Sequence, residues 1–267
     1  MKFDDFDAKM RIYETARDQV ALPGLYLAAR LDGRGFSRLT KVECDFEAPF
    51  DIRFRDLMAE TVRHLMTCGF TVVYGYAQSD EISLLFDSDE NAFGRKHRKI
   101  NSVLAGEASA KFSLMLRRLA VFDCRVIELP NPALVADYFR WRATDAHRNA
   151  LNAHCYWRLR ADGLSERAAT ARLEGLSVAA KNELLFGYGV NFNDLPAWQK
   201  RGYGFYWGES AKEGYNPKTG EKTLTSRRVI EVNYELPLKD DYAAFILSLI
   251  ECGGLIGGSD GEARDEN

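Results

Sequence analysis

The segment LYLAARLDGRG, residues 25–35, gives the clearest indication of the fold. Its first seven residues are almost wholly apolar, which is typical of a buried strand that delivers its C-terminal end to a loop. We therefore expect a strand over residues 25–31 and a loop that starts at Asp32. A carboxylate at that point of a sheet is the first candidate for chemistry.

A second acidic segment lies at the bend of a hairpin that follows a helix. Apolar residues recur every three or four positions over 50–67, which predicts a helix. Residues 70–76 and 81–86 then have the composition of strands, and the short connection between them predicts an antiparallel hairpin. Asp80 and Glu81 fall at its bend. The strand-helix-strand-strand order lets this hairpin lie beside the first strand.

Three carboxylates, Asp32, Asp80 and Glu81, are then expected to converge at one edge of the sheet. Because Mg²⁺ binds through one or two protein carboxylates together with substrate phosphates and waters, this set suits a metal-nucleotide site. The layout is that of the palm of nucleotide polymerases and cyclases. The alternative is structural, since Asp-Gly-Arg is a common turn sequence and Ser-Asp-Glu a common loop or capping sequence.

The rest of the chain adds helices and a second hairpin. Helices are expected over 4–19, 91–118, most of 131–186 and 240–250, and strands over 124–128, 203–208 and 226–235. Together the elements predict an α+β fold, an antiparallel-rich sheet with helices packed on it. We divide the chain into a palm core (1–133), a helical and β-hairpin extension packed on the palm (134–250) and a glycine-rich, acidic, disordered tail (251–267).

Composition narrows the setting. With 46% hydrophobic residues among 267, the chain can bury a sizeable core and needs no disulfides or structural metal ions to fold. Five scattered cysteines show no zinc-type spacing, which favours a reduced, cytoplasmic setting, and no leader or membrane span is evident. The net charge of -3 gives no global attraction for a polyanion, so a nucleic acid would need a local basic surface.

Five motifs in order carry a more specific signal: RLDGRGF at 30–36, FEAPFD at 46–51, YGYAQSDEIS at 74–83, DAHRN at 145–149 and AKNELLF at 180–186. They resemble the tRNA-His guanylyltransferase superfamily. The resemblance implies a palm-like catalytic domain that joins the 3′-hydroxyl of an incoming nucleotide to an activated RNA 5′ end, the reverse of ordinary polymerase direction. It implies GTP, ATP and other nucleoside triphosphates as substrates and tRNA as partner.

The same resemblance implies roles for individual residues. Asp32 and Asp80 would bridge two Mg²⁺ ions, the carbonyl of Gly33 would ligate one of them, and Glu81 would support the catalytic site. The implied triphosphate-binding residues are Arg30, Gly33, Arg34, Gly35, Phe36, Ser37, Ser79, Lys96 and Lys99. Those implied to hold the RNA 5′ end or a second nucleotide are His147, Asn149, Lys181 and Asn182.

Several of these residues also have structural interpretations. Lys96 and Lys99 lie three apart near an expected helix start, where the helix dipole favours anions, but such a start is often only a solvated surface. A lone histidine such as His147 is more often a core hydrogen-bonder. Trp141, Tyr156 and Trp157 are expected to be core aromatics rather than platforms for bases.

Two motifs depart from the family pattern. Eukaryotic enzymes that add the extra guanosine carry His-Ile-Asn-Asn-Leu-Tyr-Asn-Thr, where this chain has HRNALNAH at 147–154. The family's Lys-Pro-Asn-Asp, whose lysine contacts phosphate during activation, is Ala48-Pro49-Phe50-Asp51 here. Both departures resemble the bacterial and archaeal guanylyltransferase-like proteins, which rebuild 5′-truncated tRNA against a template.

The first expectation is therefore template-dependent 3′-to-5′ repair of tRNA. One alternative is guanylylation of histidine tRNA, and an alternative of another class is a non-catalytic RNA-binding or nucleotide-sensing palm. The resemblance also implies a homotetramer, a dimer of dimers, with no membrane association.

Overall fold

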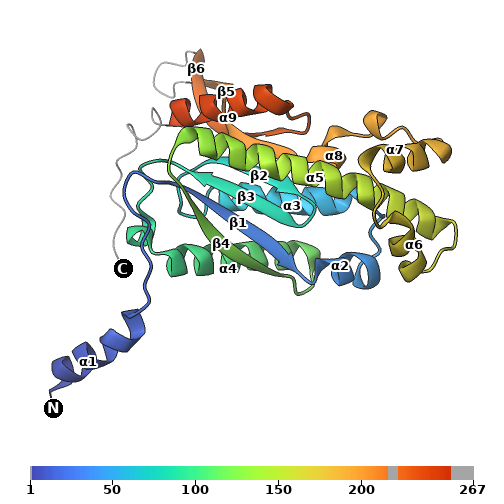
Figure 1. The fold of residues 1–267 in the computed structure, drawn as a ribbon. Helices are drawn as coiled ribbons and strands as arrows, with labels where there is room; N and C mark the ends of the chain where they lie inside the picture. Colours follow the sequence, from blue (N-terminus) through green and yellow to red (C-terminus); the bar gives the residue numbers. More distant parts are fainter. Residues whose placement is uncertain (1, 216–221, 254–267) are drawn as a thin grey trace.

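The structure, a computed structural model, describes residues 2–215 and 222–253. A six-stranded antiparallel sheet lies at the centre of this part of the chain (Figure 1). Its strand order is β4-β1-β3-β2-β5-β6. The strands are β1 (Tyr26–Arg34), β2 (Val72–Gln78), β3 (Glu81–Phe86), β4 (Val121–Leu129), β5 (Tyr203–Tyr215) and β6 (Lys222–Asn233). The expected α+β class with an antiparallel sheet is confirmed.

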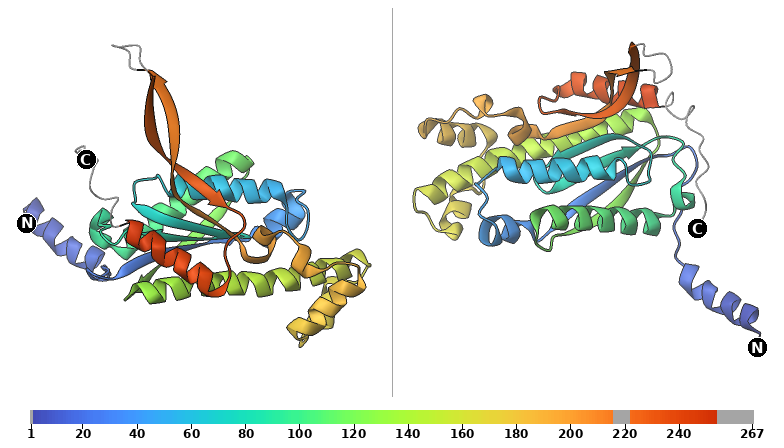
Figure 2. Two further views of the ribbon diagram at one scale, coloured as in Figure 1. Left: turned by 90° about the horizontal axis from the view of Figure 1, so that it is seen from above. Right: turned by 180° about the vertical axis from the view of Figure 1, so that it is seen from behind.

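Helices cover both faces of the sheet (Figures 1 and 2). On one face lie α3 (Ile52–Leu65) and α4 (His97–Leu116), and on the other α5 (Pro132–Ala161) and α9 (Lys239–Gly253). Alternate residues of a strand point to opposite faces. Leu31 of β1 accordingly joins the core beneath α3 and α4, whereas Ala28 joins the core beneath α5 and α9.

The first strand is longer than expected. Asp32, Gly33 and Arg34 belong to β1 and not to a loop, because β4 pairs with the strand along its whole length, from Tyr26 to Arg34. The chain leaves the sheet only at Gly35, whose φ of +73° suits glycine, and enters two short helices that the sequence did not predict. These are α2 (Phe36–Arg38) and a π-helix, η1 (Leu39–Glu43).

The second hairpin belongs to the sheet. We expected it in an extension packed on the palm, yet β5 pairs with β2 and β6 with β5, so the sheet continues through it. The outer part of the hairpin projects from the body of the protein (Figure 2). The expected tail from residue 251 begins too early, since α9 runs to Gly253; residues 254–267 lie outside the described part of the chain.

The expected helical stretch after residue 131 is three helices. The long α5 is followed by α6 (Glu166–Leu173) and α7 (Val178–Gly187), each begun by a serine whose side chain accepts a hydrogen bond from the backbone. The short helices η3 (Phe192–Asp194) and α8 (Ala197–Arg201) return the chain to the sheet. A third core cluster joins α6 and α7 to the C-terminal half of α5.

The N-terminal helix α1 (Phe3–Thr15) forms as expected, but within the described part of the chain none of its residues is buried. Its apolar side chains Phe3, Ile12 and Tyr13 are all more than 60% exposed, and the helix stands away from the body (Figure 1). The linker after it is fixed by Arg95, whose buried guanidinium donates to the carbonyl oxygens of Ala21, Leu22, Leu25 and Glu90.

The aromatic core under α4 generates a stability prediction. Phe112 is fully buried and contacts Phe36, Phe54 and Phe122, so Phe112→Ala leaves a cavity and is expected to lower the free energy of unfolding by about 3–5 kcal/mol. Leu114→Ala on the same helix, 78% exposed, is the control and changes it by less than about 0.5 kcal/mol. Urea denaturation measures both, and equal losses would contradict the assigned core.

Candidate functional site

Backbone pairing brings the predicted carboxylates together. Asp32 lies opposite Glu81 in the register of β1 and β3, and the Gly33 N–H donates to the Asp80 carbonyl oxygen at 3.0 Å. The hairpin bend between β2 and β3 is thereby tied to the end of β1. As the sequence predicted, Asp32, Asp80 and Glu81 stand at one edge of the sheet and border one cavity.

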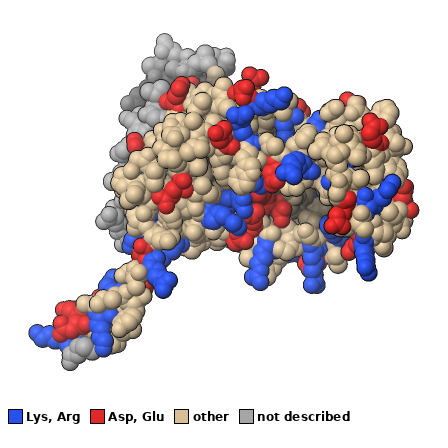
Figure 3. Space-filling view, viewed as in Figure 1, with Lys and Arg blue, Asp and Glu red and all other residues tan. Residues whose placement is uncertain are grey.

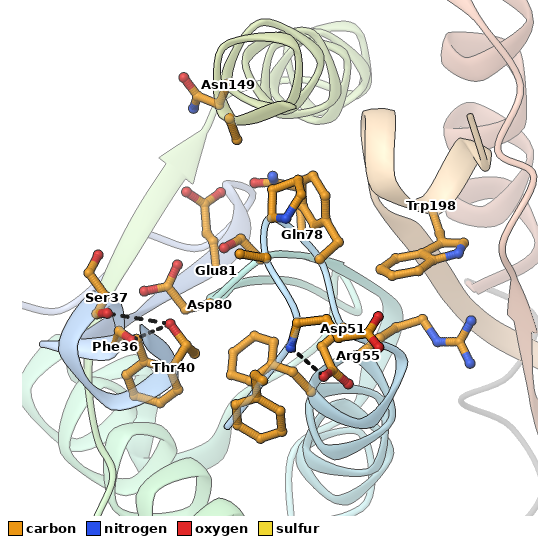
Figure 4. Close-up of a pocket in the computed structure, with 18 of the residues that line it drawn as sticks. Phe36, Ser37, Thr40, Asp51, Arg55, Gln78, Asp80, Glu81, Asn149 and Trp198 are labelled. Atoms are coloured by element: carbon orange, nitrogen blue, oxygen red, sulfur yellow. Dashed lines mark hydrogen bonds between the residues drawn. The ribbon is translucent and has the colours of Figure 1, made fainter. Parts of the chain in front are cut away.

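This cavity has a volume of about 480 Å³, within the range of small-ligand sites. Figure 4 shows Asp80 and Glu81 side by side, with Asn149 of α5 near them and Trp198 on another wall. The aromatic residues of the wall include Phe46, Phe50, Phe54, Trp157, Trp198 and Tyr203. One cavity thus combines a carboxylate cluster with aromatic surfaces on which a base can rest.

Two arginines flank Asp32. Its Oδ2 accepts a hydrogen bond from Arg30 Nε at 3.1 Å and another from Arg125, on the neighbouring strand β4, at 3.4 Å. Its Oδ1 has no hydrogen-bond partner among the described residues, and the side chain is one third exposed. On the face of the molecule drawn in Figure 3, acidic side chains lie near the middle with basic side chains beside them.

The other two carboxylates are less accessible and their pKa values are perturbed. Burial raises the pKa of Asp80, and the negative charge of Asp32 raises it further. Burial also raises the pKa of Glu81, against the opposing effect of Arg142. Arg142 donates Nε to Oε1 and a terminal nitrogen to Oε2 of Glu81, both at 2.7 Å. The sequence did not reveal this pairing, because nothing local links α5 to β3.

The donor set fits divalent cations. A free oxygen on Asp32 and a partly buried Asp80 beside it leave negative charge that a bound cation would offset. Within the described residues, no group of three or more His, Cys, Asp or Glu side chains is arranged as a closed metal site. Such a sparse set is typical of Mg²⁺, which takes its other ligands from phosphates and water.

Gly33 is required by close packing. A Cβ at this position would lie 2.5 Å from the ring of Phe36, which is buried in the aromatic core. Phe36 and Ser37 border the cavity, as does Ser79, whereas Arg34 and Gly35 are exposed and lie outside its lining. The Phe36 side chain is therefore mainly a core group, although the residue also borders the cavity.

The structure separates Lys96 and Lys99 from the carboxylates, a correction to the prediction. His97 contacts Glu128, which lies opposite Leu27 at the far end of β1. Asp32 lies five residues further along this extended strand than Leu27, a distance of about 16.5 Å at roughly 3.3 Å per residue. Lys96 instead pairs with Asp18 at 3.5 Å, so this basic segment helps to fix the linker after α1.

The residues expected at the RNA 5′ end are only partly gathered. Asn149 borders the cavity, but His147, Lys181 and Asn182 do not. The His147 ring packs on Phe192, and burial lowers its pKa, helped by the charges of Lys200 and Arg201. Lys181 Nζ donates to Asn152 Oδ1 at 2.9 Å, while Asn182 bonds the backbone of its own helix.

Two tryptophans expected in the core lie elsewhere. Trp141 is 55% exposed, and Trp157 borders the cavity. Both sit on the long helix α5, spaced so that they flank the stripe of residues 145, 149 and 153, which also borders the cavity. The apolar periodicity could not show that this stripe faces a cavity. Tyr156 does pack against the core between α5, α6 and α7.

Paired aspartates at the end of a strand, beside a cavity of nucleotide size in an antiparallel sheet, are the kind of site found in nucleotidyltransferases. Comparison with known families agrees. The family described as tRNAHis guanylyltransferase matches residues 7–130, and the C-terminal domain of the same family matches residues 133–237. The chain belongs to the tRNAHis guanylyltransferase family, which makes it a nucleotidyltransferase and confirms the resemblance.

Individual relatives agree with this assignment. The probable tRNA(His) guanylyltransferase of Drosophila melanogaster is 33% identical over 70% of this chain and 68% of its own length, and that of Mus musculus 32% over 80% and 78%. A bacterial tRNA(His) guanylyltransferase-like protein solved with ATP is 27% identical, with a TM-score of 0.69 over 92% of this chain and 99% of its own. A bacterial tRNA(His) guanylyltransferase-like protein solved with GTP is 28% identical, with a TM-score of 0.66 over the same shares of the two chains.

The crowded position of Gly33 generates a prediction. Gly33→Ala pushes Phe36 away and moves the end of β1, so we expect nucleotide incorporation to fall by about 100-fold because small displacements of reacting groups cost that much. The control is Gly106→Ala in α4, where an added Cβ meets nothing within 4 Å. It should leave activity unchanged and stabilise the fold by about 0.5–1 kcal/mol. Normal activity of Gly33→Ala would refute the constraint.

Proposed function

We propose that the protein adds nucleotides to the 5′ end of truncated tRNA in the 3′-to-5′ direction, directed by a template, with Asp32 and Asp80 holding two Mg²⁺ ions. The observation that carries the proposal is the convergence of these aspartates beside a cavity with aromatic walls. We assign the sheet with its flanking helices as a polymerase-like palm. This assignment rests on the antiparallel order and on the position of the carboxylates at a strand end.

The chain's own residues divide the work of binding. Asp32 and Asp80 would hold the ions, with the Gly33 carbonyl as an additional ligand. When bound, the ions lower the pKa of the attacking hydroxyl and offset charge on the triphosphate. Arg30, with Arg125 beside it, is placed to neutralise phosphate oxygens next to Asp32. No nucleophilic side chain is needed, because positioning and electrostatics supply the catalysis.

The departures from the family pattern support templated repair. Ala48, where the family has lysine, borders the cavity, and so does Ala153, where the eukaryotic motif has asparagine. The differences therefore fall in the substrate site and not on a remote surface. His147, Lys181 and Asn182 stay predicted contacts of the RNA 5′ end, on helices beyond the cavity.

A primer-extension assay tests the choice between activities. Purified protein with Mg²⁺ and all four nucleoside triphosphates should extend tRNA that lacks its first nucleotide faster than it adds guanosine to intact histidine tRNA. A preference for the intact histidine tRNA would establish guanylylation instead. If neither RNA is extended, the protein is a binding-only palm.

The aspartates give the most direct mutational prediction. Asp32→Asn or Asp80→Asn removes a charged metal ligand and should reduce incorporation by at least about 1000-fold while the protein stays folded. Asp123→Asn is the matched control, since Asp123 lies opposite Asp32 on β4 but outside the cavity lining. It should retain activity within about threefold. Activity in either Asp32→Asn or Asp80→Asn would exclude the two-metal mechanism.

Lys41 of the π-helix η1 is a phosphate-binding candidate that the sequence did not single out. The cavity lining holds three cations, and Arg55 and Arg142 pair with carboxylates. No carboxylate among the described residues lies within 4.0 Å of Lys41 Nζ. The amine instead lies 5.3 Å from the centre of the Trp157 ring. Among the described residues that line the cavity, Lys41 is thus the cation that is not paired with a carboxylate.

Lys41→Met should raise KM for nucleoside triphosphate by about tenfold, because a hydrogen bond from a charged donor to phosphate is lost. Lys96→Met, at the far end of the sheet and paired with Asp18, is the control and should leave KM unchanged. Steady-state kinetics with saturating RNA measures both. Equal effects would mean that the triphosphate lies elsewhere.

Assembly and setting are also proposals. We propose a homotetramer, a dimer of dimers, in the cytoplasm; the unburied apolar side chains of α1 support contact with another copy. Within residues 2–215 and 222–253, none of the helices combines the length and apolar character needed to cross a bilayer.

A further inference from the structure

Arg142 pairs with two acidic residues that border the cavity. Its guanidinium binds both oxygens of Glu81 at 2.7 Å and one oxygen of Asp145 at 3.0 Å. The side chain is only 7% exposed, and its charge lies 4.5 Å from the centre of the Trp141 ring. The position of this group is therefore fixed from several sides.

The contact also joins the two parts of the chain that the family comparisons distinguish. Glu81 lies on β3 within residues 7–130, and Arg142 lies on α5 within residues 133–237. Asp32, Asp80, Glu81 and Asp145 all border the same cavity. Arg142 forms ion pairs with two of these four acids, Glu81 and Asp145, and with neither of the other two.

We propose that Arg142 is a positioning residue that reserves the divalent cations for Asp32 and Asp80 by withholding Glu81 from them. The proposal rests on the proposed function and deepens it. A bidentate guanidinium, which stays charged at all working pH values, satisfies both carboxylate oxygens and cancels their charge. If Glu81 were released, it would be a third carboxylate one residue from Asp80. Cations drawn to it would leave the position that serves the nucleotide phosphates.

The affinity of the protein for metal ions distinguishes this role from that of a structural clamp, an ion pair that only holds α5 against the sheet. A clamp whose loss loosens the site would weaken metal binding. Loss of a withholding group frees a ligand and strengthens it, while catalysis falls because the ions are misplaced. Tighter metal binding combined with slower incorporation is the signature of the proposed role.

The experiment measures Mn²⁺ binding to the full-length, nucleotide-free protein from the electron paramagnetic resonance signal of the free ion. Arg142→Met should bind Mn²⁺ about tenfold more tightly than wild type and incorporate nucleotides about 100-fold more slowly. Arg142→Lys, which keeps the charge but donates less completely, should fall between them. The double variant Arg142→Met with Glu81→Gln should return Mn²⁺ affinity to the wild-type range, since no carboxylate is freed.

Arg140→Met is the matched control, because Arg140 lies two residues away on α5 and pairs with Asp137 and Asp240 outside the cavity. It should change neither readout. Unchanged or weaker Mn²⁺ binding in Arg142→Met and Arg142→Lys would overturn the proposal, as would failure of the double variant to reverse the gain. Asp80→Asn separates the two levels: if it leaves Mn²⁺ binding and incorporation intact, the proposed function itself fails.

Discussion

The site depends on the backbone pairing that holds the end of β1 in extended conformation. Because β4 pairs with β1 as far as Arg34, and the Gly33 N–H reaches the Asp80 carbonyl oxygen, two acidic segments far apart in sequence meet at a fixed distance. Close approach of Phe36 excludes any side chain at Gly33. The geometry of the carboxylates is thus a property of the sheet, which is more rigid than a loop.

Charge at the site is distributed unevenly: one carboxylate is neutralised by an arginine, while others keep negative charge that can bind a cation. Arg142 cancels most of the charge on Glu81, whereas Arg30 and Arg125 engage a single oxygen of Asp32. Burial raises the pKa of Asp80, and the negative charge of Asp32 adds to this effect. A divalent cation offsets that charge, and the nucleotide's phosphates complete its coordination. The weak net charge of the whole chain therefore says little about this locality.

Local patterns predicted the elements, and the element order predicted the convergence. The strand 81–86 was predicted residue for residue, and the two predicted aspartates do border one cavity. The continuation of β1 could not be predicted, because it depends on pairing with β4 much later in the chain. The pairing of Arg142 with Glu81 could not be predicted either, because it joins two distant segments. The distance of Lys96 from the site follows from the direction of β4 and not from the neighbours of Lys96 in the sequence. The apolar side chains of α1 are covered by none of the residues that the structure describes.

Anomalous diffraction from crystals soaked with Mn²⁺ and a non-hydrolysable nucleoside triphosphate shows directly whether Asp32 and Asp80 hold the metal ions. Two peaks should appear, each within about 2.5 Å of oxygens from both Asp32 and Asp80 and in contact with the triphosphate. Peaks bound only to Glu81 or to remote acids, or side chains of Asp32 and Asp80 directed away from any ion, would contradict this role of the two aspartates.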